Sequence, residues 1–580
     1  MQIPNNLGQV RQLNLGDYIG ELWETFGIDL STIPGKIKTS KQLKKILTTA
    51  QLGSPAGIVD LLIWDNKYII CTEDGIYTCS TSLDPTNSSN WSATTSSEDL
   101  DLSSTAVVFD DGTNIRLRVS LDTNIASSNV DNSYAADWWT NDKSGTALNT
   151  GYPHILAVVQ SQKETLYVTD KDRVQYYEKG AASTQIVELD SNVVACCLAP
   201  GLSGAMWVGT YSETTGNAYV YEIYTNEQVG GTTTYRQAYP VDGRAVIAIW
   251  VNNNTPHIIT ERGIVYKFNG AGFSPMAYFP FQLSGRALEG VSPGRIQASS
   301  QGRPIHPRGV KSYGDYTYIF INGESDEDAY TSTTRMHSGV WELDHNTGSL
   351  THKFPLVDES TDNGASRIEK TGPILILDNE YTFMLAGGGT DAVGVYAVQD
   401  TYGTSFFTTP EKLSQVELDT FLRTIHKSSI NGDGVIYTLY RTSKRDTAYG
   451  TAIWTSATTF NTTSDFSEVE AGDLVRVSHG YAAGEWAMVE EITSSSTVYS
   501  VKLSRSIGSN GQTSYVYSDN FKMVKDDARN TPVTYTADDG EVKRIGFDIQ
   551  APWIQVMVIL EGDIEYRMFD LVDGAKSNRK

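Results

Sequence analysis

One phrase recurs along this chain and decides its fold: IICTEDGIY at residues 69–77, LYVTDKDRV at 166–174 and IITERGIVY at 258–266. In each copy, strand-forming residues reach a threonine, an acidic residue begins a tight turn, and an apolar strand returns. Hairpins that resemble one another at intervals along a chain are typical of repeat architectures. No motif of comparable strength in the sequence points to catalysis.

Seven strand-rich units follow one another between residues 57 and 405. Each begins with an apolar run, such as IVDLLI at 58–63 or AVIAIW at 245–250, and continues through weaker strands and polar turns. Such units are typical of the four-stranded blades of a propeller, so the sequence predicts an all-β fold with a β-propeller of about six to eight blades. The seven first strands are centred near Leu61, Val107, Ile155, Val193, Val246, Val310 and Ile374.

A double-sheet sandwich is the alternative architecture for the same residues. Its strands would also alternate between apolar and polar positions. A sandwich does not explain why the threonine–acid–turn phrase recurs, so the propeller is favoured.

The composition changes after residue 405. Residues 406–450 and 526–580 predict a C-terminal β-sandwich or platform domain, with strands such as GVIYTLY at 434–440 and WIQVMVI at 553–559. Between these segments, residues 451–525 predict an inserted small barrel of the SH3 or OB kind. Its strands are VEAGDLVRV at 469–477 and AGEWAMV at 483–489, separated by a glycine-rich turn.

Residues 1–56 form a separate N-terminal segment. A strand is expected between Leu22 and Leu30, followed by a turn at Ile33-Pro34-Gly35 and a short helix over residues 40–47. Five lysines occur here in an otherwise acidic chain. They would form either a solvated helix face or a contact with an acidic neighbouring subunit, and they are Lys36, Lys38, Lys41, Lys44 and Lys45.

The chain carries a formal net charge of −24 over 580 residues. An acidic surface repels phosphate backbones, so sequence-specific binding or packaging of nucleic acid is disfavoured. The same charge suits a passage through which DNA slides without sticking. The N-terminus lacks the basic and apolar regions of a signal peptide, and no apolar run reaches membrane-spanning length, so we expect synthesis in the cytoplasm without membrane insertion.

The four cysteines indicate packing residues and not a disulfide framework. Cys71 and Cys79 flank one hairpin in registers that do not set them opposite each other, and Cys196 and Cys197 are adjacent in an apolar run. No CxxC spacing occurs. We expect all four to be reduced and buried, as suits assembly in a reducing cytosol.

No cofactor, metal or catalytic constellation is predicted, and we expect the protein not to be an enzyme. The glycine-rich run at 387–389 precedes a strand, whereas a phosphate-binding loop precedes a helix. The eight histidines are dispersed without partners at ligand spacing. His306, in the loop RPIHPR at 303–308, is interpreted as a surface loop residue that could alternatively contact a partner.

Trp138 and Trp139 are the candidate residues for glycan stacking. They lie in a polar stretch, and aromatic rings of this kind form platforms for sugars. Adjacent residues on a strand point to opposite faces, so one tryptophan at most would stack on a sugar.

The organisation of the chain resembles the tail nozzle, or tail tubular B, proteins of short-tailed bacteriophages. The resemblance rests on the Ile33-Pro34-Gly35-Lys36 turn ahead of a propeller-like run, and on the inserted barrel with its segments at 469–477 and 484–489. It implies a virion protein that assembles with copies of itself into a ring of about six. The platform domains would line the DNA ejection conduit, and the propellers would meet neighbouring tail proteins such as an adaptor or fibres.

Three functional hypotheses follow. The first is a structural tail component of the nozzle kind, which predicts a stable ring. The second is a receptor- or glycan-binding propeller at the tail tip, which predicts an exposed aromatic cleft. The third is a polysaccharide-degrading propeller enzyme, which predicts a pair of facing carboxylates at the blade axis.

Overall fold

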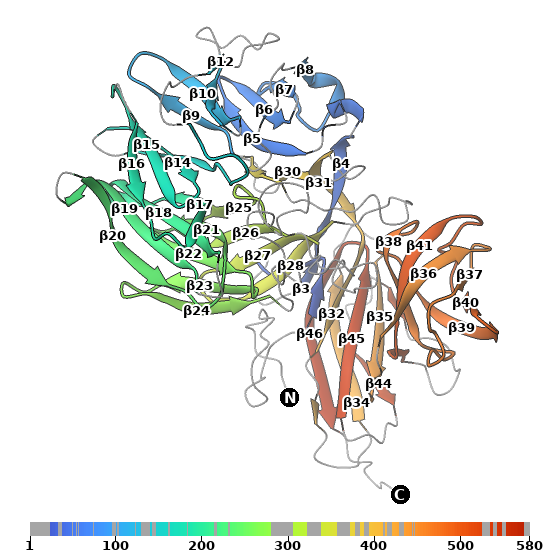
Figure 1. Ribbon diagram of the computed structural model, residues 1–580. Helices are drawn as coiled ribbons and strands as arrows, with labels where there is room; N and C mark the ends of the chain where they lie inside the picture. The colour runs from blue at the N-terminus through green and yellow to red at the C-terminus, as the bar shows by residue number, and fades with distance from the viewer. Residues whose placement is uncertain are drawn as a thin grey trace, which may run out of the picture. The chain divides into compact units, whose positions relative to one another are not determined.

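The computed structural model describes the chain as an all-β protein (Figure 1). In the described part of the chain, three short 3-10 helices, η1 (Ala50–Leu52), η2 (Ser88–Asn90) and η3 (Leu202–Gly204), accompany the strands. The chain folds into two compact units, Met1–Leu43 with Asp328–Gly364 and Gln399–Lys580, and Lys44–Glu327 with Ala365–Val398. The residues that the structure describes are 24–32, 37–48, 50–53, 55, 57–73, 75–95, 100, 104–121, 123–128, 140–141, 147–160, 163–181, 184–213, 217–229, 232–279, 305–321, 338–356, 372–377, 383–387, 394–409, 412–413, 420–428, 434–443, 445, 447–524, 534–536, 542–547 and 553–573.

The predicted propeller is present, in the residues that the structure describes, as seven four-stranded sheets. The strand orders of the first two sheets are β5 (Ile58–Trp64), β6 (Lys67–Thr72), β7 (Gly75–Ser80), β8 (Ser92–Thr95) and, for the second, β9 (Val107–Asp110), β10 (Ile115–Ser120), β11 (Ile125–Ser127), β12 (Thr140–Asn141). The third sheet has the order β13 (Leu156–Val159), β14 (Thr165–Asp170), β15 (Arg173–Glu178), β16 (Gln185–Glu188). The fourth has the order β17 (Val193–Pro200), β18 (Ala205–Ser212), β19 (Tyr219–Val229), β20 (Thr232–Pro240). The fifth sheet has the order β21 (Val246–Asn252), β22 (Thr255–Thr260), β23 (Ile264–Phe268), β24 (Phe273–Tyr278). The sixth has the order β25 (Val310–Tyr313), β26 (Tyr316–Ile321), β27 (Gly339–Asp344), β28 (Leu350–Pro355). The seventh has the order β29 (Ile374–Ile376), β30 (Phe383–Gly387), β31 (Gly394–Tyr402), β4 (Lys41–Leu47).

The innermost strands form a closed ring within the second unit. In chain order, β9, β13, β17, β21, β25 and β29 each contact the next, and β29 contacts β5. The ring is completed by an apolar cluster that joins Val59 and Ile69 of the first sheet to Leu117 and Val119 of the second. Six of the seven predicted first strands contain their predicted centre, and the seventh begins one residue after Ile155, so the predicted repeat is confirmed.

The acidic residue of the recurring phrase has a structural role. Asp170 is fully buried, and its Oδ1 accepts the backbone N–H of Asn149 at 2.7 Å. Glu261 accepts the backbone N–H groups of Arg244 and Ala245 at 2.7 and 3.0 Å. In both sheets the turn after the second strand therefore holds the chain that leads into the first strand. A buried N–H left unpaired would cost about 1–3 kcal/mol, which explains why an acceptor is needed at this turn.

The helix predicted over residues 40–47 is wrong, because Lys41–Leu47 forms strand β4. β4 precedes the first propeller sheet in sequence but is the outermost strand of the last one. Leu47 is buried with Leu375 and Val395 of that sheet. The spacing of apolar residues in so short a segment is compatible with a helix or a strand. The segment forms a strand because it pairs with the edge of the seventh sheet, at β31.

Two further sheets form the platform, which draws on both ends of the chain. The first sheet contains β1 (Glu24–Phe26), β32 (Thr404–Thr408), β45 (Trp553–Glu561), β35 (Val435–Arg441) and β42 (Lys522–Met523), with β33 (Lys412–Leu413) beside β45 and β43 (Thr534–Thr536) beside β35. The second has the order β2 (Ile28–Asp29), β3 (Ile37–Thr39), β46 (Ile564–Asp573), β34 (Thr420–Ser428), β44 (Val542–Phe547).

The two platform sheets pack through a shared apolar cluster that includes Ile28, Ile37, Phe407 and Val558. The chain changes sheets at Gly27, whose φ of +65° allows the sharp bend between β1 and β2. A Cβ at that glycine would lie 2.8 Å from the Oγ of Ser405, so both the bend and the packing require glycine.

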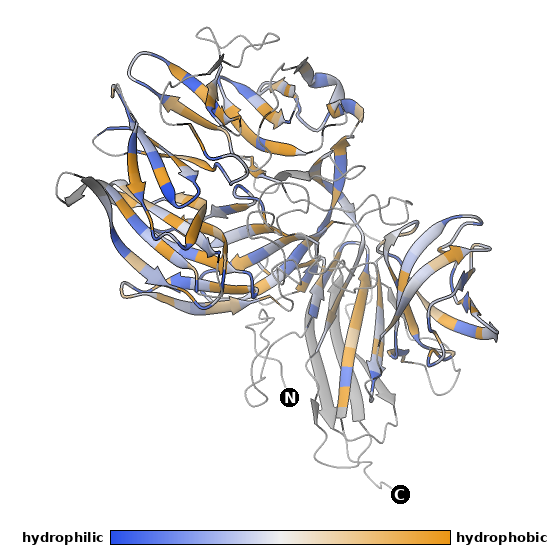
Figure 2. Ribbon diagram, in the orientation of Figure 1, coloured by the Kyte–Doolittle hydropathy of each residue, from blue (hydrophilic) through white to orange (hydrophobic). Residues whose placement is uncertain are grey.

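The inserted module is a closed six-stranded barrel. Its strands close in the order β36 (Ala448–Trp454), β37 (Thr459–Thr462), β40 (Val498–Leu503), β39 (Trp486–Ser495), β38 (Leu474–Gly480), β41 (Thr513–Asp519). Apolar and polar residues alternate along these strands in Figure 2, as expected for strands with one face in a core. Trp454 and Phe460 lie in that core, whereas Ile453 points outward with 55% of its surface exposed.

Gly209 provides a test of the packing between propeller sheets. A Cβ at this position would lie 2.4 Å from the Sγ of Cys197 and 2.7 Å from a methyl of Val246 in the next sheet. We expect Gly209→Ala to destabilise the propeller by about 1–3 kcal/mol through overpacking, measured as faster amide hydrogen exchange in β17, β18 and β21. Gly272→Ala is the control, because its Cβ would meet nothing within 4 Å, and it should change stability by less than about 0.5 kcal/mol. Equal effects of the two changes would contradict this packing.

Candidate functional site

Arg308 crosses the centre of the propeller ring. It lies just before β25, the innermost strand of the sixth sheet, yet its Nε is 3.6 Å from the Oδ2 of Asp60 on β5 of the first sheet. Its Nη2 donates to the carbonyl of Leu156 on β13 of the third sheet at 3.4 Å. These sheets are not neighbours in the ring. A side chain that reaches both of them from the sixth sheet therefore lies in the central channel.

Asp60 is the fixed anion of this axial cluster, which comprises Asp60, Arg308 and Lys311. Only 3% of its side chain is exposed, and its oxygens accept the backbone N–H groups of Leu61 at 2.8 Å and Ala106 at 2.7 Å. Burial raises the pKa of Asp60, while the Arg308 cation, these two hydrogen bonds and the more distant Lys311 oppose that rise. Asp60 thus joins two sheets and anchors the positive charge at the axis.

The backbone around Arg308 is held rigidly. Its N–H donates to the Nδ1 of buried His306 at 3.0 Å, and its carbonyl accepts the N–H of Ile374 in the seventh sheet at 2.9 Å. The interpretation of His306 as a surface loop residue is therefore wrong, because the imidazole is buried and serves as an acceptor. Arg308 is the last residue of the RPIHPR segment and lies just before the first strand of a sheet. That position is the sequence signal that would have identified Arg308 as a residue of the ring centre.

A buried arginine joins the barrel to the platform. Arg476 of β38 lies between the rings of Phe406 and Tyr517, with each centroid 4.4 Å from its guanidinium carbon. Its Nη2 is 2.7 Å from the Oδ2 of Asp519, and its Nη1 is 3.8 Å from the Oε1 of Glu24 on β1. Planar aromatic faces and two carboxylates therefore compensate the burial of the cation.

A second contact of the same joint centres on Glu561 at the end of β45. Its Oε1 accepts hydrogen bonds from the Nε1 of Trp486 at 2.9 Å and the Nη1 of Arg505 at 2.6 Å. The Trp486 ring also meets the ring of Tyr437 edge-on at 4.8 Å. Barrel and platform thus share an apolar and ionic boundary and not only a covalent linker.

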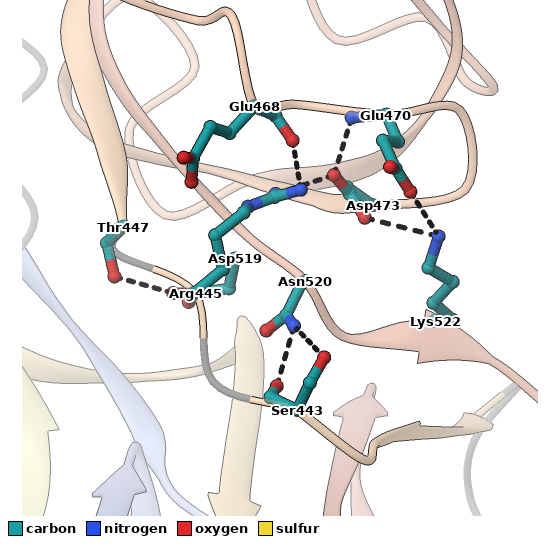
Figure 3. Close-up of polar contacts among 9 residues, drawn as sticks. All are labelled: Ser443, Arg445, Thr447, Glu468, Glu470, Asp473, Asp519, Asn520 and Lys522. Atoms are coloured by element: carbon teal, nitrogen blue, oxygen red, sulfur yellow. Dashed lines mark hydrogen bonds and ion pairs between the residues drawn. The ribbon is translucent and has the colours of Figure 1, made fainter.

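The chain enters and leaves the barrel through two bonded segments (Figure 3). The Nδ2 of Asn520 in the outgoing segment donates to the carbonyl of Ser443 in the incoming one at 2.6 Å. The Oγ1 of Thr447 donates to the Oδ1 of Asp519 at 2.9 Å. These bonds close the base of the insertion.

Asp473 is the buried anion of this connection. Its side chain is fully buried, and Oδ2 accepts from the Nη2 of Arg445 at 2.6 Å and the backbone N–H of Glu470 at 2.7 Å (Figure 3). The ammonium of Lys522 lies 3.6 Å from Oδ1. Arg445 also donates to the carbonyl of Glu468. One carboxylate therefore fixes residues from both connecting segments.

The N-terminal anchor, which comprises Asp29, Ser31, Glu342 and Lys353, is a buried polar group in the first unit. Lys353 has 1% side-chain exposure, and its Nζ lies 2.6 Å from an oxygen of Glu342 and 3.3 Å from an oxygen of Asp29. It also donates to the Oγ of Ser31 at 2.6 Å. Two carboxylates compensate one ammonium, so the group suits a structural role for Lys353.

The lysines singled out in the sequence fall on β3, β4 and their surroundings. Lys38 is 3.9 Å from Asp563, Lys41 forms an ion pair with Asp400, and the ammonium of Lys45 lies 5.4 Å from the Tyr396 ring centre. Lys44 is exposed on β4, and Lys36 lies outside the described residues. Their contact with a neighbouring subunit stays a prediction. Trp138 and Trp139 also lie outside the described residues.

The four cysteines agree with the prediction that they are buried and not paired in disulfides. All four are free and buried, and Cys71 pairs in register with Ile76 while Cys79 pairs with Tyr68. Among the described residues, no three His, Cys, Asp or Glu side chains gather as a metal site requires. No helix in the described ranges has the length and apolarity to cross a membrane.

Comparisons with known proteins concern the fold alone. No protein-family model matches the chain, and no curated protein matches it. Among solved structures, it is similar to the WD40 β-propeller domain of Doa1, with a TM-score of 0.38 and 9% identity over 62% of this chain and 98% of that one. BamB from Moraxella catarrhalis gives a TM-score of 0.33 and 8% identity over 63% and 98%. The computationally designed protein Ika8 gives 0.32 and 11% over 59% and 96%.

The class is defined by the seven sheets and their closed ring. The chain is an all-β protein that contains a seven-sheet β-propeller.

The Asp473 contacts yield a stability prediction. Replacing Arg445 by methionine leaves a buried carboxylate with only the more distant Lys522 as counter-charge, so we expect the barrel to lose about 2–4 kcal/mol. Hydrogen exchange in β38 and β41 would report the loss. Lys163→Met is the control, because its 3.4 Å pair with Glu178 is exposed and should contribute less than about 0.5 kcal/mol. Unchanged protection of the barrel in the Arg445 variant would contradict this role.

The N-terminal anchor yields a pH prediction. Burial alone would raise the pKa of Asp29, but the Lys353 ammonium and hydrogen bonds from Thr32 outweigh it and lower that pKa. A carboxyl whose pKa is lower in the folded state stabilises that state above its unfolded pKa of about 3.9, and loses the effect as pH falls through the folded value. We therefore expect Asp29→Asn to lower the melting temperature at pH 7, with the difference shrinking below about pH 4. A difference that stays constant from pH 7 to pH 3 would refute the assignment.

Proposed function

We propose that this protein is a structural subunit of a bacteriophage tail, of the nozzle kind. Copies would form a ring of about six around the DNA ejection conduit, with the propeller and barrel as docking modules for neighbouring tail proteins. The protein would act in the virion after synthesis in the host cytoplasm.

The observation that carries this proposal is the construction of the platform. Its strands come from residues 24–39, from 404–441 and from 522–573, so both ends of the described chain belong to one domain. In sequence, all the described propeller strands fall between β3 and β32, and all the barrel strands fall between β35 and β42. A domain that accepts two large insertions without losing its own core suits a scaffold that presents modules to different partners.

The joint between barrel and platform supports a role under mechanical load. Arg476 lies 3.8 Å from Glu24 and Arg505 lies 2.6 Å from Glu561 across it, and an apolar cluster that includes Met488 and Met557 backs these ionic contacts. A flexible tether would require only the covalent connections. A rigid joint holds a module in a fixed direction, which a ring of identical subunits needs.

The charge of the chain supports a conduit. A net charge of −24 per copy, repeated around a ring, would give a wall that repels phosphates and lets DNA pass with little friction. The proposed conduit does not bind nucleic acid specifically.

The solution mass of the purified protein tests the proposed ring. We expect light scattering to give about six copies and negative-stain images of the same sample to show closed rings with outward modules. The mass should persist at high salt if apolar and buried ionic contacts hold the ring. A monomer at every concentration and salt tested, including after mixing with purified tail particles that lack this protein, would contradict the proposal.

A further inference from the structure

The axial cluster has more positive than negative charge in an acidic protein. Arg308 and Lys311 face one buried carboxylate, Asp60, at the ring centre. Enclosure by surrounding protein and the neighbouring Arg308 cation both lower the pKa of Lys311, whereas Asp60 raises it. Lys311 is exposed on β25, although neighbouring protein encloses part of its side chain, and it forms no ion pair with any described residue.

Among the described residues, the contacts of Arg308 use a small part of its hydrogen-bonding capacity. A guanidinium has five N–H donors in a planar fork. The structure gives Arg308 one donor contact at 3.4 Å to the Leu156 carbonyl and one ion pair at 3.6 Å with Asp60. Both distances exceed the 2.7–2.9 Å that charge-assisted bonds prefer. With 38% of its side chain exposed, Arg308 can still bind a ligand.

Asp60 is a poor competitor for those donors. Two backbone N–H groups already occupy its oxygens, and its carboxylate is fixed between the first and second sheets. It therefore holds the arginine at the axis without saturating it. A carboxylate or phosphate group entering the channel would meet the fork of Arg308 on one side and the ammonium of Lys311 nearby.

We propose that the channel of the propeller is a binding site for a small ligand with an oxyanion group, a carboxylate or a phosphate, and that Arg308 and Lys311 bind it. Arg308 supplies paired N–H donors, Lys311 adds charge, and Asp60 is a positioning residue. This site is independent of the tail role, because it lies within the propeller of a single copy.

Calorimetric titration of the full chain tests the site, with inorganic phosphate and glucuronate as separate probes and sodium chloride of matched ionic strength as a blank. We expect saturable binding on the order of millimolar for at least one probe. Arg308→Gln should weaken it by about tenfold or more, and Arg308→Lys by less, since charge survives without the fork. Binding of phosphate alone or glucuronate alone identifies which oxyanion the channel prefers.

Two further variants keep the test decisive. Lys311→Met changes an exposed residue, so it should fold and weaken binding several-fold even if Arg308→Gln does not fold. Arg262→Gln is the matched control. Arg262 is an exposed propeller cation whose partner, at 2.9 Å, is Asp242 and not a residue of the axial cluster. The affinity of this variant for the probes should match that of the parent protein. The site is refuted if neither probe binds beyond the chloride blank, or if Lys311→Met and Arg262→Gln bind alike.

Discussion

The closure of seven sheets into one ring is the constraint on which the rest of the propeller depends. A four-stranded sheet such as β17–β20 has apolar residues on both faces, and Val193 and Val194 of its first strand are both buried. Such a sheet is stable only between two neighbours, so the series of sheets must either continue or close. The contact of β29 with β5 closes it, and β4 completes the last sheet with residues that precede the first.

Ring closure also explains why the axial cluster exists and why sequence reading missed it. The seven first strands were predicted because each carries a local apolar run, and local pattern is what a single sequence reports. The contact between Arg308 and Leu156 joins residues 152 positions apart. This contact depends on the number of blades and on the set of side chains that point to the axis. The recurring phrase in the sequence specifies neither. The strand β4 was mistaken for a helix for the same reason, since its partner lies at the other end of the repeat.

Buried charge is used throughout this chain where parts of the fold meet. Arg476 lies between two rings and two carboxylates, Lys353 lies between Glu342 and Asp29, and Asp473 accepts from Arg445. Removing such groups from water costs several kcal/mol, which full compensation only offsets, so these contacts add little to stability when intact. The required directions of these hydrogen bonds and ion pairs instead favour one arrangement of the strands and segments that they join. Any other arrangement would leave a charge buried and unpaired.

Burial of carboxylates also changes how the acidic composition should be interpreted. The formal charge of −24 counts every carboxylate equally, yet Asp60, Asp170, Glu342 and Asp473 are buried and bonded to backbone N–H groups or cations. Their fields are largely cancelled at short range and contribute little at the surface. What DNA or any other polyanion would meet is set by the exposed charged groups of both signs. An acidic protein can therefore hold a cluster such as Asp60, Arg308 and Lys311, in which positive charge exceeds negative charge, because the electrostatics at an enclosed site depend on the few groups that line it and not on the total.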